Sequence, residues 1–408
     1  MKRLLWPLGL AALLSSPMVV SAQPTATDQT RLTLDQAQRL AAARSLELSA
    51  AQHEVDAASG GVQQAGARRN PELSMTIEDM RSATRTTTTT IGFPLELGGK
   101  RAARVSAAER VRDVLAAQLA NVRAKVRADV VADYFAVVAA QERVRLTEDS
   151  ARLAAQAANA VGKRVVAGKV SPVAETRAQV DAANAQLEAT EARAALSSAR
   201  QALAALWGDA EPLFEQVDGS ASDVPSRPST PELLREVDES PSLVSSRLEI
   251  DVRRAQVDVE RTKAMPDVVV SVGTKRDNEL GLTQAVVGVS IPLPIFDRNQ
   301  GAAWQASKLV DKARDDYEAA RVRILSELSQ ASTQLATAQA SLAVLRDTVL
   351  PAAQRSYDAS TTGFEAGKFA FLDVIDAQRA LLQARARTLN TLVTAWQAAT
   401  TIDRLLGR

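Results

Sequence analysis

The sequence has no cysteine, one histidine and only 3 % aromatic residues. Without cysteine the chain forms no disulfide, offers no thiolate to a metal and has no cysteine for a lipid anchor. The single histidine, His53, cannot complete a usual zinc pattern. Neither a GxxxxGK[ST] loop nor a GxSxG elbow occurs, so we expect no cofactor, no metal site and no enzymatic activity.

An excess of either charge is also missing. Lys and Arg number 49 against 48 Asp and Glu, which leaves a formal net charge of +1. No global field therefore attracts nucleic acid, and we expect no nucleic-acid partner. The 408 residues are 46 % hydrophobic and rich in alanine, a composition that suits close helix packing and predicts a mainly α fold.

Long apolar runs are absent after residue 22. The first residues, "MKRLLWPLGLAALLSSPMVVSA", combine a basic start, an apolar stretch and small residues, which predicts a signal peptide over residues 1–22 and an exported protein. No later apolar run reaches about 20 residues, so we expect no helix to span a bilayer. If the protein lies in a membrane, it does so as strands.

The chain is internally duplicated. "VVAGKVSPVAETRAQ" at 165–179 aligns with "FEAGKFAFLDVIDAQ" at 364–378 at an offset of 199, and Pro94 aligns with Pro292 at an offset of 198. Landmarks that keep one order at nearly one spacing indicate a repeat of about 200 residues. We predict a first repeat at 23–228 and a second at 229–408.

Each repeat has the same predicted plan: a helix, a strand pair, a very long helix, a turn and another helix. Val and Thr enrichment predicts strands long enough to cross a tilted bilayer. Apolar residues at heptad spacing predict coiled-coil helices, with Pro351 expected to kink or break one of them. The predicted strands are 72–80, 85–95, 267–275 and 282–293, and the predicted long helices are 100–161, 172–207, 300–362 and 371–405.

A strand meets a helix in "TTTTTIGFPLELGGKR" at 86–101, and again near "SIPLPIFDRNQ". Proline cannot donate to a ladder, so we expect the first strand to stop at Pro94. Lys100 and Arg101 oppose the dipole of the helix they begin, so we expect them to contact interfacial phosphates or another subunit. The predicted junction residues are Pro94, Gly98, Gly99, Pro292 and Phe296.

Four strands cannot close a membrane barrel, because the smallest such barrels have about eight. One chain would leave strand edges exposed to lipid. Several chains must contribute, and three chains would give twelve strands.

These motifs resemble the TolC-like outer-membrane efflux proteins, through "VSIPLPIFDRNQG" and the paired turns "VAGKVS" and "EAGKFAFLDVIDAQ". "NPELSMTIED" followed by "FPLELGGKRAAR" is similar to the cobalt-zinc-cadmium branch. The resemblance implies a homotrimer with a 12-stranded β-barrel in outer-membrane lipid and a coiled-coil periplasmic tunnel. It also implies a passive exit duct for heavy-metal cations that docks to a periplasmic adaptor and an inner-membrane pump of the resistance-nodulation-division type.

The resemblance assigns roles to two groups of residues. From the residues alone, the AGK turns fit simple helical hairpins, and Asp373 and Asp376 fit a solvated helix face or a helix N-terminal charge pair. The resemblance implies that both aspartates face the pore entrance, where Phe369 replaces an arginine of some drug-exporting relatives. It implies that the adaptor contacts Val166, Gly168, Lys169, Ser171, Gly367 and Lys368.

Two alternatives stay open at this point. One keeps the channel and changes the exported molecule to a drug or, as in type I secretion, a protein. The other is a secreted coiled-coil structural protein without a pore, which the low aromatic content favours because membrane barrels usually carry aromatic girdles. The sequence does not name the ion.

Overall fold

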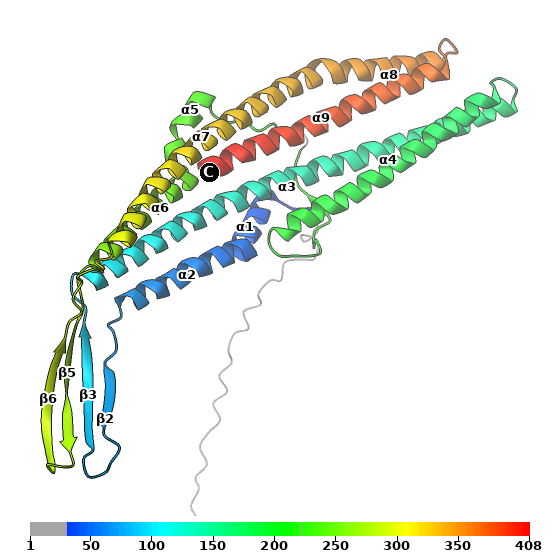
Figure 1. Cartoon of the computed structure of the whole chain (residues 1–408). Coiled ribbons are helices and arrows are strands. Elements are labelled where there is room, and N and C mark those ends of the chain that lie inside the picture. The colour runs from blue at the N-terminus through cyan, green and yellow to red at the C-terminus, as the bar shows by residue number, and fades with distance from the viewer. Residues whose placement is uncertain (1–30, 221) are drawn as a thin grey trace, which may run out of the picture.

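The computed structural model describes residues 31–220 and 222–408, and the predicted signal peptide lies outside the described residues. The fold is elongated: four strands form one end, helices run the length of the molecule, and two helical hairpins form the other end (Figure 1). Among the residues described, no helix combines the length and apolarity needed to cross a membrane.

The long helices form a single layer. α3 packs against both α4 and α9, and α9 packs against α7 and α8, so the order across the layer is α7/α8, α9, α3, α4 (Figure 1). The layer has α4 at one edge and α7 and α8 at the other. These helices are α3 (Lys100–Val166), α4 (Pro172–Ala205), α7 (Gln300–Val344), α8 (Leu350–Glu365) and α9 (Phe371–Leu406).

Two helix boundaries differ from those expected. α3 continues through Gly162 to Val166, because one glycine in a helix costs only about 1 kcal/mol. Pro351 does not end its helix. The chain becomes π-helical over Leu345–Val349 just before it, and this wider turn accommodates a residue that has no N–H to donate.

Shorter helices cover the layer near the strands. α2 packs on α3, and α6 packs on both α3 and α7. The N-termini of α1 and α6 are capped by side chains. At the start of α6, Ser240 Oγ accepts from the Leu243 N–H, which satisfies one of the free donors of a first turn. The helices are α1 (Leu34–Arg44), α2 (Leu46–Gly66), α5 (Thr230–Arg235) and α6 (Pro241–Thr262), with a 3₁₀ turn at Val237–Glu239.

The strands form one antiparallel sheet in the order β2-β3-β5-β6. β3 pairs with β5, so a hairpin from each half of the chain meets at the centre of the sheet. β2 and β6 are the edges, and each has a neighbour on one side only. The strands are β2 (Glu72–Glu78), β3 (Thr86–Leu95), β5 (Val268–Asp277) and β6 (Leu282–Ser290), and a small parallel pair joins β1 (Arg31–Leu32) to β4 (Gln216–Val217).

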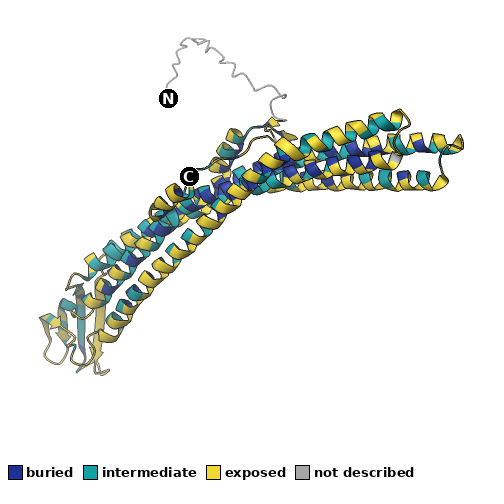
Figure 2. Ribbon diagram, turned by 90° about the horizontal axis from the view of Figure 1, so that it is seen from above, coloured by how far each residue is buried: buried dark blue, intermediate teal, exposed yellow. Residues whose placement is uncertain are grey.

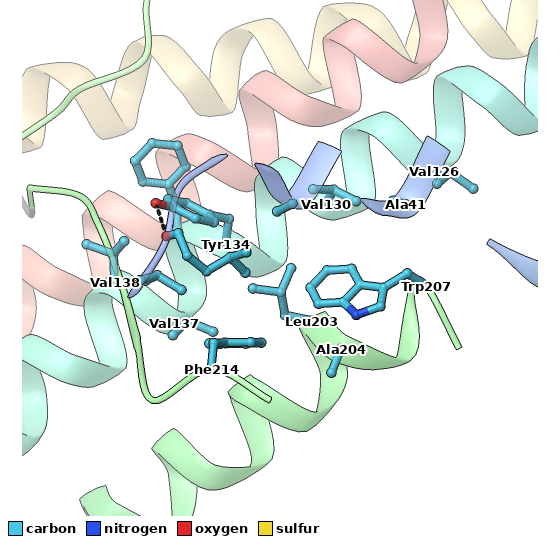
Figure 3. Packing of buried hydrophobic residues seen from close by; sticks show 14 of the residues in the cluster. Ala41, Val126, Val130, Tyr134, Val137, Val138, Leu203, Ala204, Trp207 and Phe214 are labelled. Atoms are coloured by element: carbon cyan, nitrogen blue, oxygen red, sulfur yellow. Dashed lines mark hydrogen bonds between the residues drawn. The ribbon is translucent and has the colours of Figure 1, made fainter. Parts of the chain in front are cut away.

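The best-packed core lies midway along the molecule, where Figure 2 shows most of the buried residues. Tyr134 is 1 % exposed, and its hydroxyl donates to the Leu32 carbonyl at 3.0 Å and to the Asp218 carbonyl (Figure 3). Phe135 stacks on Trp396 of α9 with ring centroids 3.5 Å apart. Trp207 and Phe214 belong to the same cluster, so several of the chain's few aromatic residues lie where β1, β4, α3 and α9 meet.

The segment 206–229, which connects the two halves, is bonded to helices of the second half. The side-chain amide of Gln339 donates to the Pro225 carbonyl at 2.8 Å, and Trp396 Nε1 donates to the Asp223 carbonyl at 3.0 Å. These bonds satisfy backbone carbonyls that lie outside any helix or strand. They fix the two halves to each other at the level of the core.

Leu392 provides a test of this packing. It is 1 % exposed in the cluster between α7 and α9, so Leu392→Ala removes buried apolar contacts and should cost about 2–5 kcal/mol. We expect a lower unfolding temperature, measured by circular dichroism of the purified protein. Leu213→Ala is the matched control, because Leu213 is 81 % exposed. An equal effect of both variants would contradict the assignment of Leu392 to the core.

Candidate functional site

The sheet has one apolar face and one polar face. Residues opposite each other on paired strands share a face, so the register groups Leu73 with Ile91, Val272 and Val287 on the apolar side. The apolar side chains are exposed, with Val272 at 46 % and Val287 at 75 %. A monomeric soluble protein rarely presents such a patch to water. The apolar face also includes Met75, Ile77, Phe93, Leu95, Val268, Val270, Ala285 and Val289.

The opposite face is mainly polar and contains glycine where the strands come close. A Cβ on Gly273 would lie 2.0 Å from the Thr89 carbonyl oxygen, and one on Gly288 would lie 2.7 Å from Ser271 Oγ. Glycine in a strand commonly marks such a close approach. Its members in register are Glu72, Ser74, Thr76, Glu78, Thr86, Thr88, Thr90, Gly92, Pro94, Val269, Ser271, Gly273, Lys275, Asp277, Leu282, Gln284, Val286, Gly288 and Ser290.

The first junction between sheet and helices differs in two respects from the expectation. The ladder does not stop at Pro94, which lies opposite Val269 while Leu95 lies opposite Val268. β2 begins opposite Gly92, so Pro94 has a strand on one side only, where proline is tolerated. Pro292 lies beyond the end of β6 at Ser290.

The basic residues at the start of α3 have partners within the chain. Lys100 Nζ lies 2.6 Å from Asp267 Oδ1, and both side chains are mostly buried. The Arg101 guanidinium donates to the Gly66 carbonyl at 2.6 Å. The expected phosphate or subunit contact is therefore wrong for Lys100, whereas that of Arg101, which is exposed, stays a prediction. Intrachain acceptors offset the unfavourable dipole instead.

An ion network joins three segments at this junction. Arg104 Nη1 lies 2.5 Å from Glu96 Oε1, and Arg69 lies within 3.5 Å of both Glu96 and Asp267. The hydrogen bond from Arg104 holds the pKa of Glu96 below its usual value, and the same contact raises the pKa of Arg104. The network ties the end of α2 and the segment before β5 to the start of α3.

Glycine geometry sets the turn into α3. Gly98 and Gly99 have φ angles of 71° and 76°, which non-glycine residues rarely adopt. A Cβ on Gly98 would also lie 2.8 Å from Met265 Cβ. Both predicted junction glycines therefore occupy positions that favour glycine.

The second junction uses an asparagine in place of a glycine. Asn299 has a φ of 58°, and its side-chain amide donates at 2.8 Å to the Glu260 carbonyl and carboxylate. Asparagine tolerates this left-handed conformation better than most residues. Phe296 is 92 % exposed and Trp304 is 68 % exposed, so this side of the junction presents aromatic surface.

The two hairpin turns at the far end have the same backbone geometry. Gly168 and Gly367 have φ angles of 68° and 72°, and the Lys169 and Lys368 amides donate back to the Arg164 and Gly363 carbonyls at 2.8 Å. This is the usual way for a helix to end at glycine. Both lysines are exposed, Val166 is 90 % exposed, and Ser171 Oγ accepts from the Val173 N–H to begin α4.

Asp373 and Asp376 lie three residues apart at the start of α9, and both are exposed. Asp373 Oδ2 accepts from the Ala370 N–H at 2.9 Å, so it caps the helix that carries it. Phe369 lies against Gly363, where an added Cβ would come within 2.5 Å of its ring. The structure thus brings these residues together beside the second turn.

Sequence reasoning missed the contacts between the two hairpins. The Arg164 guanidinium lies over the Phe364 ring, 4.3 Å from its centroid, a cation–π contact. Arg379 of α9 forms an ion pair with Asp181 of α4. A polar cavity of about 620 Å³ lies between α3, α4 and α9 and contains both members of this pair. No local pattern links residues this far apart in sequence.

A half-buried carboxylate pair on α3 was also missed. Burial and the neighbouring Asp129 raise the pKa of Asp133 to about 6. Burial raises the pKa of Asp129 as well, although Lys125 opposes this. Burial makes the ionised form of a carboxylate less stable than it is in water. The ionised carboxylate of Asp133 therefore lowers the free energy of unfolding at pH values above about 6. From the sequence alone, the four-residue spacing of Asp129 and Asp133 predicts neither their burial nor a raised pKa.

His53 approaches Ser49 Oγ at 3.4 Å on an exposed face of α2. Within residues 31–220 and 222–408, no three His, Asp or Glu side chains are close enough together to hold a metal ion. The structure presents three features: a sheet with one apolar and one polar face, a single layer of helices, and two exposed turns.

Comparisons with known proteins identify the family to which this chain belongs. The family model described as outer membrane efflux protein matches residues 37–209 and 235–408. The chain is a member of the outer membrane efflux protein family. It is 50 % identical to the cobalt-zinc-cadmium resistance protein CzcC of Cupriavidus metallidurans, with both chains covered over 100 % of their length. It is also 34 % identical to the nickel and cobalt resistance protein CnrC of the same organism, covering 70 % of this chain and 69 % of that one.

Solved structures of this type share the fold. A membrane protein from Pseudomonas aeruginosa superimposes with a TM-score of 0.80 at 18 % identity, covering 91 % of this chain and 92 % of that one. The CusC structure gives a TM-score of 0.75 at 17 % identity, with 91 % of each chain covered. The predicted resemblance to outer-membrane efflux proteins is thereby confirmed, and so is the mainly helical fold.

The ion network at the first junction can be tested in this outer-membrane efflux protein. Asp267→Asn leaves the mostly buried Lys100 ammonium without its partner at 2.6 Å, and should cost roughly 1–3 kcal/mol. We expect a lower unfolding temperature. Asp311→Asn is the control, since it removes an exposed pair with Lys308 and should change stability by less than about 1 kcal/mol. Equal stability of both variants and the wild type would show that the network contributes nothing.

Proposed function

We propose that this chain is the outer-membrane exit duct of a tripartite efflux system that removes heavy-metal cations. Three copies assemble into a 12-stranded β-barrel in outer-membrane lipid, continued by a helical tunnel in the periplasm. The duct is passive, and docks to a periplasmic adaptor and to an inner-membrane pump. Neither cofactor nor catalysis takes part.

The two-faced sheet with two unpaired edges carries this proposal. Unpaired backbone groups at β2 and β6 cost several kcal/mol each in lipid, so the sheet must close. Four strands are too few to do so, and the family is named for the outer membrane. Closure by copies of the chain pairs β6 of one copy with β2 of the next, with the apolar face toward lipid.

The helical layer supports the tunnel in the same way. α4 and α8 lie at opposite edges of the layer, and α4 exposes Val173, Val180 and Leu187 at seven-residue intervals. Heptad spacing of apolar residues favours packing against another helix. Joining the α4 edge of one copy to the α8 edge of the next would close a cylinder below the barrel.

The proposed metal cargo rests on the relatives. CzcC, CnrC and the nickel-cobalt-cadmium resistance protein NccC of Alcaligenes xylosoxydans xylosoxydans are all named for divalent transition-metal resistance. The last of these is 28 % identical to this chain, with 73 % of it covered. Drugs or a secreted protein remain the alternative cargo. Family membership argues against the secreted coiled-coil structural protein.

Two regions at the periplasmic end would do the work of gating and docking. The exposed turns offer the adaptor backbone and lysine contacts, and our candidates remain Val166, Gly168, Lys169, Ser171, Gly367 and Lys368. Asp373, Asp376 and Phe369 would line the pore entrance. Three copies of the two exposed aspartates would form a ring of six carboxylates that attracts cations.

Deletion of the gene in its host tests the cargo. We expect a lower tolerated concentration of zinc, cobalt, cadmium, nickel or copper salts, by about tenfold or less, with no change for drugs. Complementation with the wild-type gene should restore growth, and Asp311→Asn serves as a neutral variant because it changes only exposed pairs with Lys308 and Arg314. Drug sensitivity without metal sensitivity would contradict the metal assignment.

Replacing both entrance aspartates tests the pore. The double variant Asp373→Ala, Asp376→Ala removes six negative charges from a trimer, and should lower the cation preference of purified channels in planar bilayers by roughly twofold or more. Reversal potentials in a potassium chloride gradient measure this preference. Unchanged selectivity with intact conductance would remove these residues from the pore entrance.

A further inference from the structure

The carboxylate of Glu72, on the polar face of the sheet, has no counter-charge among the described residues. Glu72 begins β2, and the residues in register with it across the sheet are Gly92, Ser271 and Gly288. Gly92 and Gly288 carry no side chain at this level, and Ser271 carries only a hydroxyl. Among these four residues in register, at the end of the sheet next to the helices, Glu72 therefore carries the one charged side chain.

Within the described part of the chain, Glu72 forms no ion pair, not even with Arg68 four residues before it. Two other nearby cations are engaged elsewhere: Arg69 with Glu96 and Asp267, and Lys100 with Asp267. At the other end of the polar face, by contrast, Glu78 Oε2 lies 3.8 Å from Lys275 Nζ. The two ends of the sheet differ in how their acids are neutralised.

Closure of the sheet brings no cation to Glu72. Its open edge would be covered by β6 of a second copy, and β6 has the sequence "LTQAVVGVS" without a charged residue. This holds for every register of the two strands and for either face, so the strand that would cover Glu72 supplies no cation to it.

We propose that Glu72 is a selectivity residue of the barrel. Three copies form a carboxylate ring on the water-filled side, at the end of the strands next to the helices. Low-dielectric walls concentrate the field of such a ring and raise the local concentration of cations. This inference rests on the proposed trimeric channel, and it places a second cation-selective level far from Asp373 and Asp376 at the other end of the molecule.

Bilayer recordings of purified channels test the proposal, with reversal potentials taken in a potassium chloride gradient. Glu72→Gln should lower the ratio of cation to anion permeability by about twofold or more, and Glu72→Lys should lower it further. Glu279→Gln is the matched control, because Glu279 is an exposed carboxylate in the turn between β5 and β6. The effect should be large at about 0.05 M salt and small at 1 M, where the screening length is about 3 Å.

The outcomes separate this inference from the function on which it rests. If the wild-type protein forms no trimer on unheated gels and no pore, the proposed function fails. If pores form and both Glu72 variants keep the wild-type reversal potential at low salt, the selectivity role of Glu72 is wrong and the channel stands. Should Glu72→Lys fail to assemble, Ser74→Lys places a cation on the same face two residues along β2, and an unchanged reversal potential would equally overturn the proposal.

Discussion

The unpaired edges of the four-stranded sheet constrain everything else in this molecule. A backbone N–H or C=O without a partner costs little in water and several kcal/mol in hydrocarbon. A sheet whose exposed face is apolar thus has stable surroundings only if β2 and β6 find further strands. The long helices α3 and α7 inherit this constraint, because each follows a strand and must lie where the closed sheet directs it.

The two junctions set the direction of the helices that leave the sheet through backbone conformation and through ion pairs. Gly98, Gly99 and Asn299 take left-handed conformations at the two turns, and the first turn is fixed further by the pair between Lys100 and Asp267. The ion network holds three cations, Arg69, Lys100 and Arg104, against two carboxylates, Glu96 and Asp267, so the first junction keeps a net positive charge. Glu72, on the polar face of the sheet, has no ion pair in the described part of the chain.

Much of this architecture could be predicted from sequence, because it depends on periodicity. The Val and Thr runs, the heptad spacing and the AGK repeat each report a local preference that the structure keeps. Pro94 was misjudged because its tolerance depends on where β2 begins, which is a property of the sheet. Lys100 was misjudged because Asp267 is 167 residues away in the chain, and the contact between Arg164 and Phe364 escaped notice for the same reason.

The pairing of β3 with β5 has a consequence for the order of folding. The two strands are in register from Thr86 opposite Asp277 to Leu95 opposite Val268, so the inner strand of the first hairpin waits for the second half of the chain to be synthesised. Contacts between residues so distant in sequence form slowly, and an apolar hairpin that waits is prone to aggregate. Until the second repeat is present, the first repeat therefore exposes an apolar hairpin, and it depends on a chaperone to keep it from aggregating.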